Sequence, residues 1–340
     1  MTAAEKIADI LWPIFLPLSF LYCLLAKLRF ILYKSGVFKS YRLPGFTISV
    51  GNLEIGGTGK TPIVIDLCKY LSAKNKTVCI LTRGYKSGLK ANEFAVLKNE
   101  KVLLSNSASD SFYADEAKLQ SAKLNDVPVI IGANRYDAAI NYLKHYDAPN
   151  YWILEDGFQH LKLKRNLDIV LLDDKKPLSQ RNLCLPSGRL REGVGALQRA
   201  SHVLFTRAVG TPNKKLKKKL DNWKLPYDCI TFSMQKPINL KSRKVLDNSI
   251  DFSLIVGIAK PNHIIEQLKT WGLEAQQHFI LSDHGNIPTE KLLKEIKSKR
   301  SLLITEKDYY RHQDFFDKYK QSIYIIELGT SFDAEMLSFD

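Results

Sequence analysis

A glycine-rich stretch carries the clearest chemical signal in the sequence. Residues 56–61 read Gly-Gly-Thr-Gly-Lys-Thr, and they follow a run at 46–50 that is typical of a β-strand. Backbone N–H groups of such glycines can curl around phosphate oxygens, a lysine neutralises the β- and γ-phosphates, and a threonine hydroxyl ligates Mg²⁺. The stretch therefore predicts a loop that binds ATP and Mg²⁺. The residues expected to hold the nucleotide are Gly56, Gly57, Thr58, Gly59, Lys60 and Thr61.

The loop departs from the strict pattern at one position. The pattern G-x-x-x-x-G-K-[ST] requires glycine at position 54, where this chain has Glu54. Its context is nevertheless that of a phosphate loop, because a predicted strand precedes it and a predicted helix follows, whose N-terminus favours bound phosphate. We interpret it as an atypical Walker A loop.

Such a loop also needs an acid at the end of a buried strand, close to the metal ion. Two segments qualify. Residues 151–156 read Tyr-Trp-Ile-Leu-Glu-Asp, and residues 169–174 read Ile-Val-Leu-Leu-Asp-Asp. Spacing along the chain does not decide between them.

Short apolar runs alternate with helical stretches from residue 45 onward. Runs of this kind, rich in Val, Ile and Leu, suit strands that are buried on both faces of a parallel sheet. The fold class predicted is α/β, a P-loop NTPase-like, mostly parallel sheet flanked by helices. Strands are expected at Phe46–Val50, Val78–Thr82, Val127–Ile131, Tyr151–Leu154, Leu167–Leu172 and His202–Thr206, a hairpin at Glu93–Ser105, and helices at Thr61–Leu71 and Tyr136–Lys144.

A second, smaller set of elements follows a lysine-rich run at 214–219. Strands are expected at Cys229–Met234, Leu254–Ile258, Leu302–Thr305 and Ile323–Glu327, with helices at His263–Trp271 and Thr289–Ser298. We therefore expect a membrane-anchoring helical segment at 1–40, a P-loop domain at 41–228, and a C-terminal α/β lobe at 229–340 that completes the active site.

The N-terminal region contains an apolar segment from Ile10 to Ala26 without a charged residue. It is short for a membrane span, which needs about 20 apolar residues, and its basic residues come after it, unlike those of a signal peptide. Pro13 and Pro17 are expected to kink the helix. We predict a membrane anchor, either spanning or lying in the interface, with the rest of the chain on the cytoplasmic side. A buried core helix is the alternative.

The overall composition indicates an anionic partner. The formal net charge is +15 over 340 residues, and 45% of the residues are hydrophobic, enough for a substantial core. Nucleic acid, an anionic membrane surface and a phosphorylated substrate all fit this charge. The lysines at 214–219 are either a solvated helix face or a contact for anionic headgroups. Five cysteines without a C-x-x-C pair argue against a disulfide framework and a zinc site.

Seven segments, in order along the chain, resemble those of the tetraacyldisaccharide 4′-kinases of lipid A biosynthesis. Seven matches in order are far more specific than one. The segments are Gly51-Asn52 with Gly56–Pro62, Thr82–Tyr85, Ala114–Glu116 (Ala where Gly is usual), Glu155–His160 (Glu for the first Asp), Leu185–Glu192, Ser282–His284 and Thr305–Asp308.

The resemblance implies the reaction. In that family the γ-phosphoryl group of ATP passes to the 4′-hydroxyl of a lipid A disaccharide 1-phosphate, so the chain is expected to be an ATP-dependent lipid kinase. It also implies anchoring to the cytoplasmic face of the bacterial inner membrane. This agrees with the anchor and the charge read from the sequence itself.

The resemblance also assigns catalytic residues. Asp115 is implied as the base that takes the proton of the sugar hydroxyl, assisted by His284. Asp115 and Glu116 could instead stabilise a helix dipole, and His284 could simply lie in a loop.

Further residues are candidates by their chemistry. Arg135, which lies between a strand and a helix, can clamp the transferring phosphate, although a surface salt bridge is its ordinary role. Arg191 offers a cation for phosphate. The candidate metal ligands are Thr61, Asp156, Glu155 and Glu192, with Asp156 preferred as the acid of the metal site. The roles of Lys307 and Asp308 stay open.

Two other functions are alternatives to the kinase. A membrane-associated ATPase with a deviant Walker A loop and no lipid substrate would place a signature lysine at position 55, where this chain has Ile55. A nucleic-acid-binding protein would explain the charge, but no corresponding motif is present, so no nucleic acid partner is expected.

Overall fold

The structure is a computed structural model that describes residues 12–84, 87–107, 113–174, 182–207, 214–257, 261–281 and 287–337. Outside these ranges lie several positions named in the predictions, which are Ile10, Tyr85, Ile258 and the segment Ser282–His284. The chain forms two compact units. The large unit groups residues 1–113, 120–232 and 330–340, and the small unit groups 114–119 and 233–329. Each is described by itself, and the predicted boundaries at 40/41 and 228/229 stay predictions.

The large unit is built on a nine-stranded sheet with the order β4-β3-β5-β2-β6-β1-β7-β8-β9. All of its neighbouring strands run parallel except β3, which is antiparallel to both β4 and β5. The predicted parallel sheet and the hairpin are therefore confirmed. The strands are β1 (Phe46–Asn52), β2 (Val78–Thr82), β3 (Phe94–Lys98), β4 (Lys101–Ser105), β5 (Val129–Gly132), β6 (Tyr151–Glu155), β7 (Leu167–Asp173), β8 (His202–Thr206) and β9 (Tyr227–Ile230).

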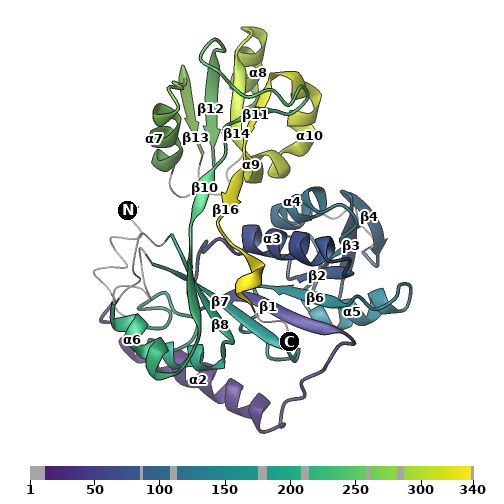
Figure 1. Cartoon of the computed structure of the whole chain (residues 1–340), viewed down its shortest axis with the longest axis vertical. Helices are drawn as coiled ribbons and strands as arrows, with labels where there is room; N and C mark the ends of the chain where they lie inside the picture. Colours follow the sequence, from purple (N-terminus) through teal and green to yellow (C-terminus); the bar gives the residue numbers. More distant parts are fainter. Residues whose placement is uncertain are drawn as a thin grey trace. The chain divides into compact units, whose positions relative to one another are not determined.

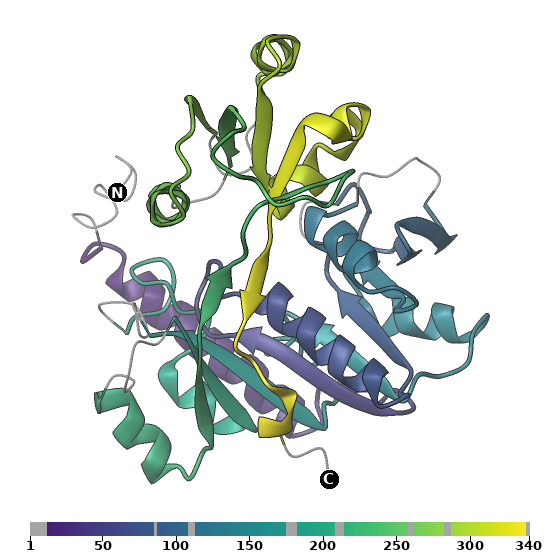
Figure 2. The ribbon, with the colours of Figure 1, turned by 45° about the horizontal axis from the view of Figure 1, so that its top comes forward.

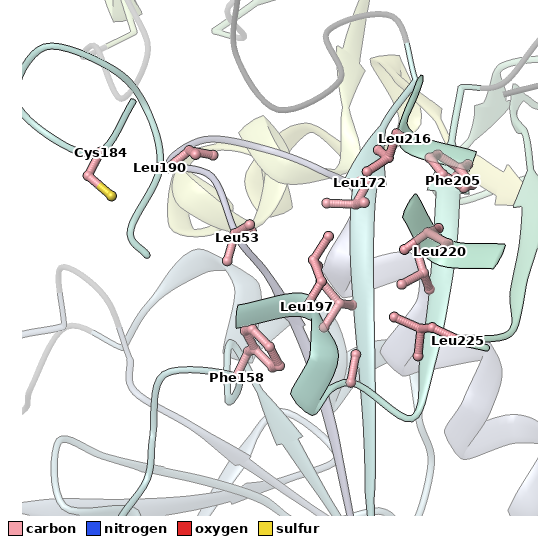
Figure 3. Close-up of a cluster of buried hydrophobic side chains, with 13 residues drawn as sticks. Leu53, Phe158, Leu172, Cys184, Leu190, Leu197, Phe205, Leu216, Leu220 and Leu225 are labelled. Atoms are coloured by element: carbon pink, nitrogen blue, oxygen red, sulfur yellow. The ribbon is translucent and has the colours of Figure 1, made fainter. Parts of the chain in front are cut away.

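Helices cover both faces of this sheet (Figure 1 and Figure 2). Helix α3 packs on β1 and β6. The other face carries two hydrophobic clusters, one covered by α5 and the other by α6 and the 3₁₀ helix η1. Figure 3 shows the second cluster, where Leu216 and Leu220 of α6 and Leu197 of η1 pack near Leu172 and Phe205. The helices of the large unit are α2 (Leu16–Lys34), α3 (Lys60–Ala73), α5 (Arg135–Leu143) and α6 (Lys214–Asn222), with η1 at Val194–Arg199 and η3 at Ala334–Met336. Helix α4 (Asp115–Lys123) is divided, because its residues 115–119 group with the small unit.

Small side chains on β1 separate the two clusters. The register aligns Thr47 with Trp152 and Gly51 with Val170, so the small residues of β1 share one face with the large residues of β6 and β7. A Cβ atom on Gly51 would lie 2.8 Å from the backbone nitrogen of Phe158. The missing side chain therefore lets the segment after β6 cross over β1, and this crossing carries the residues after Glu155 toward the phosphate loop.

The small unit contains a five-stranded sheet with the order β11-β15-β14-β12-β13, in which only β11 is antiparallel to its neighbour. Its strands are β11 (Ile238–Asn239), β12 (Phe252–Val256), β13 (Gln277–Ile280), β14 (Ser301–Thr305) and β15 (Ile323–Ile326). Its helices are α7 (Asn262–Thr270), α8 (Thr289–Lys297), α9 (Glu306–Arg311) and α10 (Gln313–Phe316), with η2 at Asp317–Ser322. Separate hydrophobic clusters lie beneath α7 and beneath α8 to α10, so the predicted C-terminal α/β lobe is confirmed.

Two sequence-based expectations need correction. The single strand expected at Cys229–Met234 is wrong, because β9 ends on the large sheet at Ile230 and the next three residues form β10 (Phe232–Met234), which pairs with β16 (Leu328–Thr330). A kink at Pro17 is also not needed, since Pro17 lies in the first turn of α2, where its missing N–H has no helical partner to lose.

Candidate functional site

The phosphate loop leads directly into α3, as the sequence predicts. Gly59 precedes the helix with φ +84°, and Gly56 has φ +118°. A Cβ atom at position 59 would lie 2.1 Å from the ring of Phe232. Glycine is therefore required at position 59 both by the backbone angle and by the close approach of an aromatic ring.

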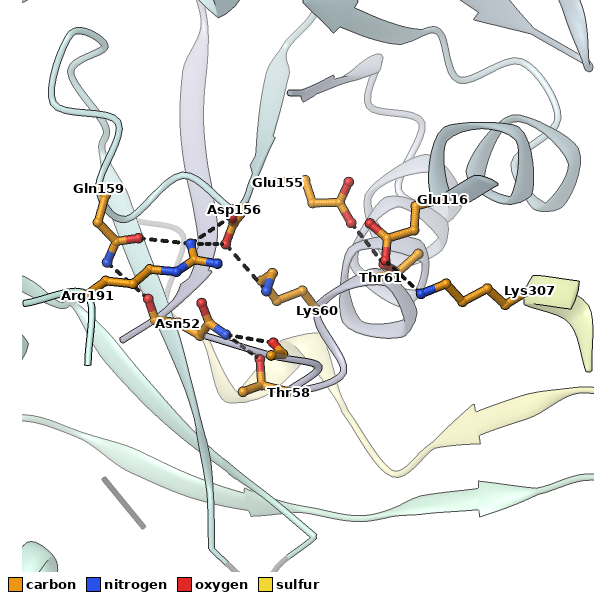
Figure 4. A network of polar contacts seen from close by, with 11 residues as sticks. Asn52, Thr58, Lys60, Thr61, Glu116, Glu155, Asp156, Gln159, Arg191 and Lys307 are labelled. Atoms are coloured by element: carbon orange, nitrogen blue, oxygen red, sulfur yellow. Dashed lines mark hydrogen bonds and ion pairs between the residues drawn. The ribbon is translucent and has the colours of Figure 1, made fainter. Parts of the chain in front are cut away.

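Asn52 fixes the shape of this loop from within. Its side-chain amide donates to the carbonyl of Gly56 (3.3 Å) and to Oγ1 of Thr58 (3.1 Å), and Asn52 is fully buried. The amide of Gln159 in turn donates to the Asn52 carbonyl at 3.1 Å (Figure 4). The motif comparison includes Asn52 and Gln159, but pattern alone gave neither of them a role.

The residue at position 54 explains how the loop does without the usual glycine. Glu54 forms an antiparallel bridge with Leu190, and the hydrogen bonds on either side join Ile55 N to Arg189 O (2.9 Å) and Arg191 N to Leu53 O (2.8 Å). An extended backbone of this kind accepts any side chain, so glycine is not required. The same pairing brings Arg191 beside the phosphate loop.

Asp156 connects the loop lysine to that arginine. Its carboxylate lies 3.4 Å from Nζ of Lys60 and accepts two hydrogen bonds from Nη1 of Arg191, at 2.8 and 2.9 Å (Figure 4). Burial by itself raises the pKa of Asp156, but the charges of Lys60 and Arg191 outweigh burial and hold this pKa below its ordinary value. The carboxylate is thus ionised and holds both cations at the loop.

Thr61 contacts the other acid of the pair. Its hydroxyl donates to Oε1 of Glu155 at 3.0 Å, and Glu155 is buried at the end of β6. In the parts of the chain that the structure describes, no three His, Cys, Asp or Glu side chains gather as a metal site. A hydroxyl and one carboxylate suit Mg²⁺, which keeps much of its shell for water and phosphate oxygens. Asp173, from the other candidate segment, is paired with Arg207.

Glu192 is paired with an arginine. Its carboxylate accepts two hydrogen bonds from the guanidinium of Arg199, at 2.7 and 2.9 Å. Arg199 also lies 4.6 Å from the ring centres of both Phe30 and Phe158. Among the predicted metal ligands, Thr61 and Glu155 therefore contact each other, whereas Glu192 forms an ion pair with Arg199.

Arg135 is buried and contacts a histidine. Its Nη1 lies 3.1 Å from Nδ1 of His160, and because arginine can only donate, Nδ1 accepts and the ring proton is on Nε2. Burial, followed by the charge of Arg135, lowers the pKa of His160 to about 3. Burial also lowers the pKa of Arg135 to about 10, so the guanidinium stays charged at neutral pH. His160 is a site residue to which sequence reasoning gave no role.

Asp115 is predicted within the P-loop domain at 41–228, and His284 within the C-terminal lobe. Asp115 begins α4 and groups with the small unit, where Nε of Arg311 donates to it at 2.9 Å. Lys307, whose role was open, lies 3.8 Å from the carboxylate of Glu116. His284 lies outside the described residues, so its pairing with Asp115 stays a prediction.

Replacing Gly59 tests the geometry of the loop. We expect Gly59→Ala to weaken binding of a fluorescent ATP analogue at least about 100-fold, since the strained φ and the clash with Phe232 displace the backbone donors. Gly57→Ala is the matched comparison, because its Cβ would meet no atom within 4 Å, and its loss should be about tenfold smaller. Equal losses for the two variants would contradict the assigned geometry.

The neutral histidine predicts a pH dependence of stability. Since the pKa of His160 falls from 6.5 to about 3 on folding, the unfolded chain binds more protons between these values. The folded state therefore loses stability as the pH drops below the unfolded pKa, by at most about 1.4 kcal/mol per pH unit. Thermal melts should show a shallower pH slope for His160→Gln. His145→Gln, at an exposed histidine, is the control, and equal slopes for all three proteins would refute the assignment.

Comparison with known proteins places this arrangement in a family. The family model described as tetraacyldisaccharide-1-P 4′-kinase, LpxK, matches residues 11–339. The relatives named tetraacyldisaccharide 4′-kinase include one from Shewanella halifaxensis, 31% identical over 96% of this chain and 92% of its own. Another, from Pelobacter propionicus, is 33% identical over 81% of this chain and 74% of its own.

A solved structure shares the fold. The crystal structure of LpxK from Aquifex aeolicus in complex with ATP is 26% identical, covers 96% of both chains and superposes with a TM-score of 0.73. The family model extends over nearly the whole chain, and the relatives carry the same name. Together they show that this chain belongs to the tetraacyldisaccharide-1-P 4′-kinase family, whose members are ATP-dependent kinases of lipid A biosynthesis.

Proposed function

We propose that this chain transfers the γ-phosphoryl group of ATP to the 4′-hydroxyl of a tetraacyldisaccharide 1-phosphate. One observation carries the proposal most directly. Lys60 and Thr61 open α3 behind the glycine loop, and each contacts one acid at the end of β6, Lys60 with Asp156 and Thr61 with Glu155. This arrangement of loop, lysine, hydroxyl and acids is the one by which P-loop enzymes hold a triphosphate.

The residues of the large unit divide the work of binding and charge neutralisation. The backbone donors of the loop and the N-terminus of α3 receive the phosphates, and Lys60 neutralises the β- and γ-oxygens as charge moves to the leaving group. Asp156 orients Lys60 and holds Arg191 within reach of phosphate. Thr61 and Glu155 would hold a Mg²⁺ ion, which supplies further neutralisation of phosphate charge.

The acceptor hydroxyl must lose a proton as it attacks phosphorus. We assign this proton to the carboxylate of Asp115, with His284 assisting. The new bond joins the 4′-oxygen to the γ-phosphorus, the bond from that phosphorus to the bridging oxygen breaks, and ADP leaves with the electron pair. Arg135 is assigned to a phosphate oxygen, because its buried guanidinium stays charged.

A phosphotransfer assay tests these assignments. With radiolabelled ATP and the disaccharide 1-phosphate in detergent micelles, we expect product from the unmodified protein and rates about 1,000-fold lower for Lys60→Ala and Asp115→Asn. Lys69→Ala is the matched control, because Lys69 is an exposed lysine on the same helix. Full activity of Lys60→Ala would refute the assigned role of the loop. ATP hydrolysis without labelled lipid would support the rival ATPase.

The N-terminal helix is the part of the large unit suited to a lipid surface. Helix α2 is 19 residues long and apolar enough to be a candidate membrane segment. Its outer face is apolar, with exposed side chains at Leu18, Phe20, Leu21, Leu24, Leu25, Leu28 and Ile31. Membrane association of the chain is therefore supported by the helix as well as by the family.

The contacts of α2 suggest how it lies. Ser187 donates through its N–H to Oγ of Ser19 and through its hydroxyl to the carbonyl of Trp12, both at 2.8 Å. About three turns after Ser19, Phe30 packs against Arg199. Because α2 is attached to the large unit from its start to near its end, we propose that it lies in the plane of the interface. The basic residues that follow it favour the anionic cytoplasmic leaflet.

Flotation with vesicles tests this arrangement. The double variant Leu21→Gln/Leu25→Gln should bind vesicles of anionic phospholipid at least about 100-fold more weakly, because each leucine contributes about 1.5 to 3 kcal/mol when it is buried in lipid. Val102→Gln, at an exposed apolar residue of β4, is the control and should bind normally. Unchanged binding of the double variant would refute the assigned membrane face.

A further inference from the structure

A buried arginine at the end of α9 connects two acids of the small unit. The side chain of Arg311 is 6% exposed. Its Nε donates to Oδ2 of Asp115 at 2.9 Å, and its Nη1 donates to Oδ1 of Asp308 at 3.1 Å. Asp115 and Asp308 are both buried, so all three groups of this chain of contacts are withdrawn from water.

Asp308 is itself fixed by several hydrogen bonds. Its Oδ2 accepts the N–H of Gly257 at 2.9 Å and the hydroxyl of Thr305 at 2.7 Å, and its own N–H donates back to Thr305 at 3.2 Å. A Cβ atom at Gly257 would lie 2.7 Å from the carboxylate. Asp308 is thus a fixed anchor at the start of α9, and it fixes the guanidinium one turn later.

The remaining nitrogen of Arg311 argues against a purely structural role. Among the residues that the structure describes, its Nη2 is buried without a hydrogen-bond partner. Leaving such a donor unpaired costs roughly 1 to 3 kcal/mol. Unsatisfied buried groups of this kind are found at functional sites, where geometry is maintained at the expense of stability.

We propose that Arg311 is a positioning residue for the reaction, which holds the Asp115 carboxylate in the orientation that accepts the proton of the acceptor hydroxyl. Asp308 fixes Arg311, and this gives the Thr305–Asp308 motif a role. The inference rests on the proposed function, since it requires Asp115 as the base. A planar guanidinium that is hydrogen-bonded to two carboxylates fixes both the position and the orientation of the Asp115 carboxylate. The flexible ammonium of a lysine would fix the orientation less well.

A double-mutant cycle separates this role from simple packing. We expect Arg311→Gln to lower kcat about 100-fold, with the KM for ATP changed less than about threefold, as for a displaced catalytic group. In an Asp115→Asn background the same replacement should cost almost nothing more, because the group that Arg311 positions is already gone. Arg311→Lys should recover about tenfold of the loss, and Asp308→Asn should resemble Arg311→Gln with a smaller effect.

Arg300→Gln provides the matched control. Arg300 donates to Glu295 at 2.9 Å in the same unit but does not contact Asp115, so its loss should leave kcat unchanged. Thermal melts of all variants measure their stability in parallel. If Arg311→Gln does not fold, the double-mutant cycle is carried out with Arg311→Lys. Equal losses from Arg311→Gln in both backgrounds, or an unchanged kcat, would overturn the positioning role alone. Absence of product from the unmodified protein would overturn the proposed function and this inference with it.

Discussion

The carboxylate of Asp156 is the contact on which the rest of the candidate site depends. Asp156 directly follows β6, and its backbone is in the left-handed region with φ +51°. Its carboxylate contacts both Lys60 at the start of α3 and Arg191, which is distant in the sequence. Two cations without this acid would repel each other beside the loop. With it, the loop is surrounded by positive charge before a nucleotide arrives, so binding requires little rearrangement.

The position of this carboxylate is a consequence of side-chain size on a neighbouring strand. Residues on one face of β1 are small, and Gly51 leaves room for the backbone of Phe158. The segment after β6 can therefore cross β1 and place Gln159 against Asn52. The packing of β1 thus determines the path of the backbone after β6, and that path determines where the charged groups of the site lie. The site forms at the ends of parallel strands.

Sequence patterns predict the strands and the loop well, because these depend on local chemistry. The runs at Val78–Thr82 and His202–Thr206 coincide with β2 and β8. The glycine-rich loop before α3 and the acids at the ends of β6 and β7 also lie where the sequence predicts them, because the spacing of these residues is local. Boundaries failed where tertiary contacts decide them, as at Ile230, where the chain leaves one sheet for another pairing.

The partners of charged residues could not be predicted from spacing. The sequence makes Glu192 a candidate metal ligand but gives no sign of its contact with Arg199, which lies seven residues later at the end of the 3₁₀ helix η1. Arg311 carried no signal at all, because its partner Asp115 is distant in sequence and only the fold brings them together. Such pairs depend on long-range packing, which no local pattern contains.

The attachment of α2 has a kinetic consequence. Ser187, which binds the start of this helix, lies only a few residues before Arg191, which contacts the acid beside the loop. Under the in-plane arrangement that we propose, the phosphate loop of the large unit is held at a fixed depth from the lipid headgroups. The encounter with an acylated substrate then becomes a two-dimensional search, and turnover follows the surface density of that substrate in the leaflet and not its bulk concentration.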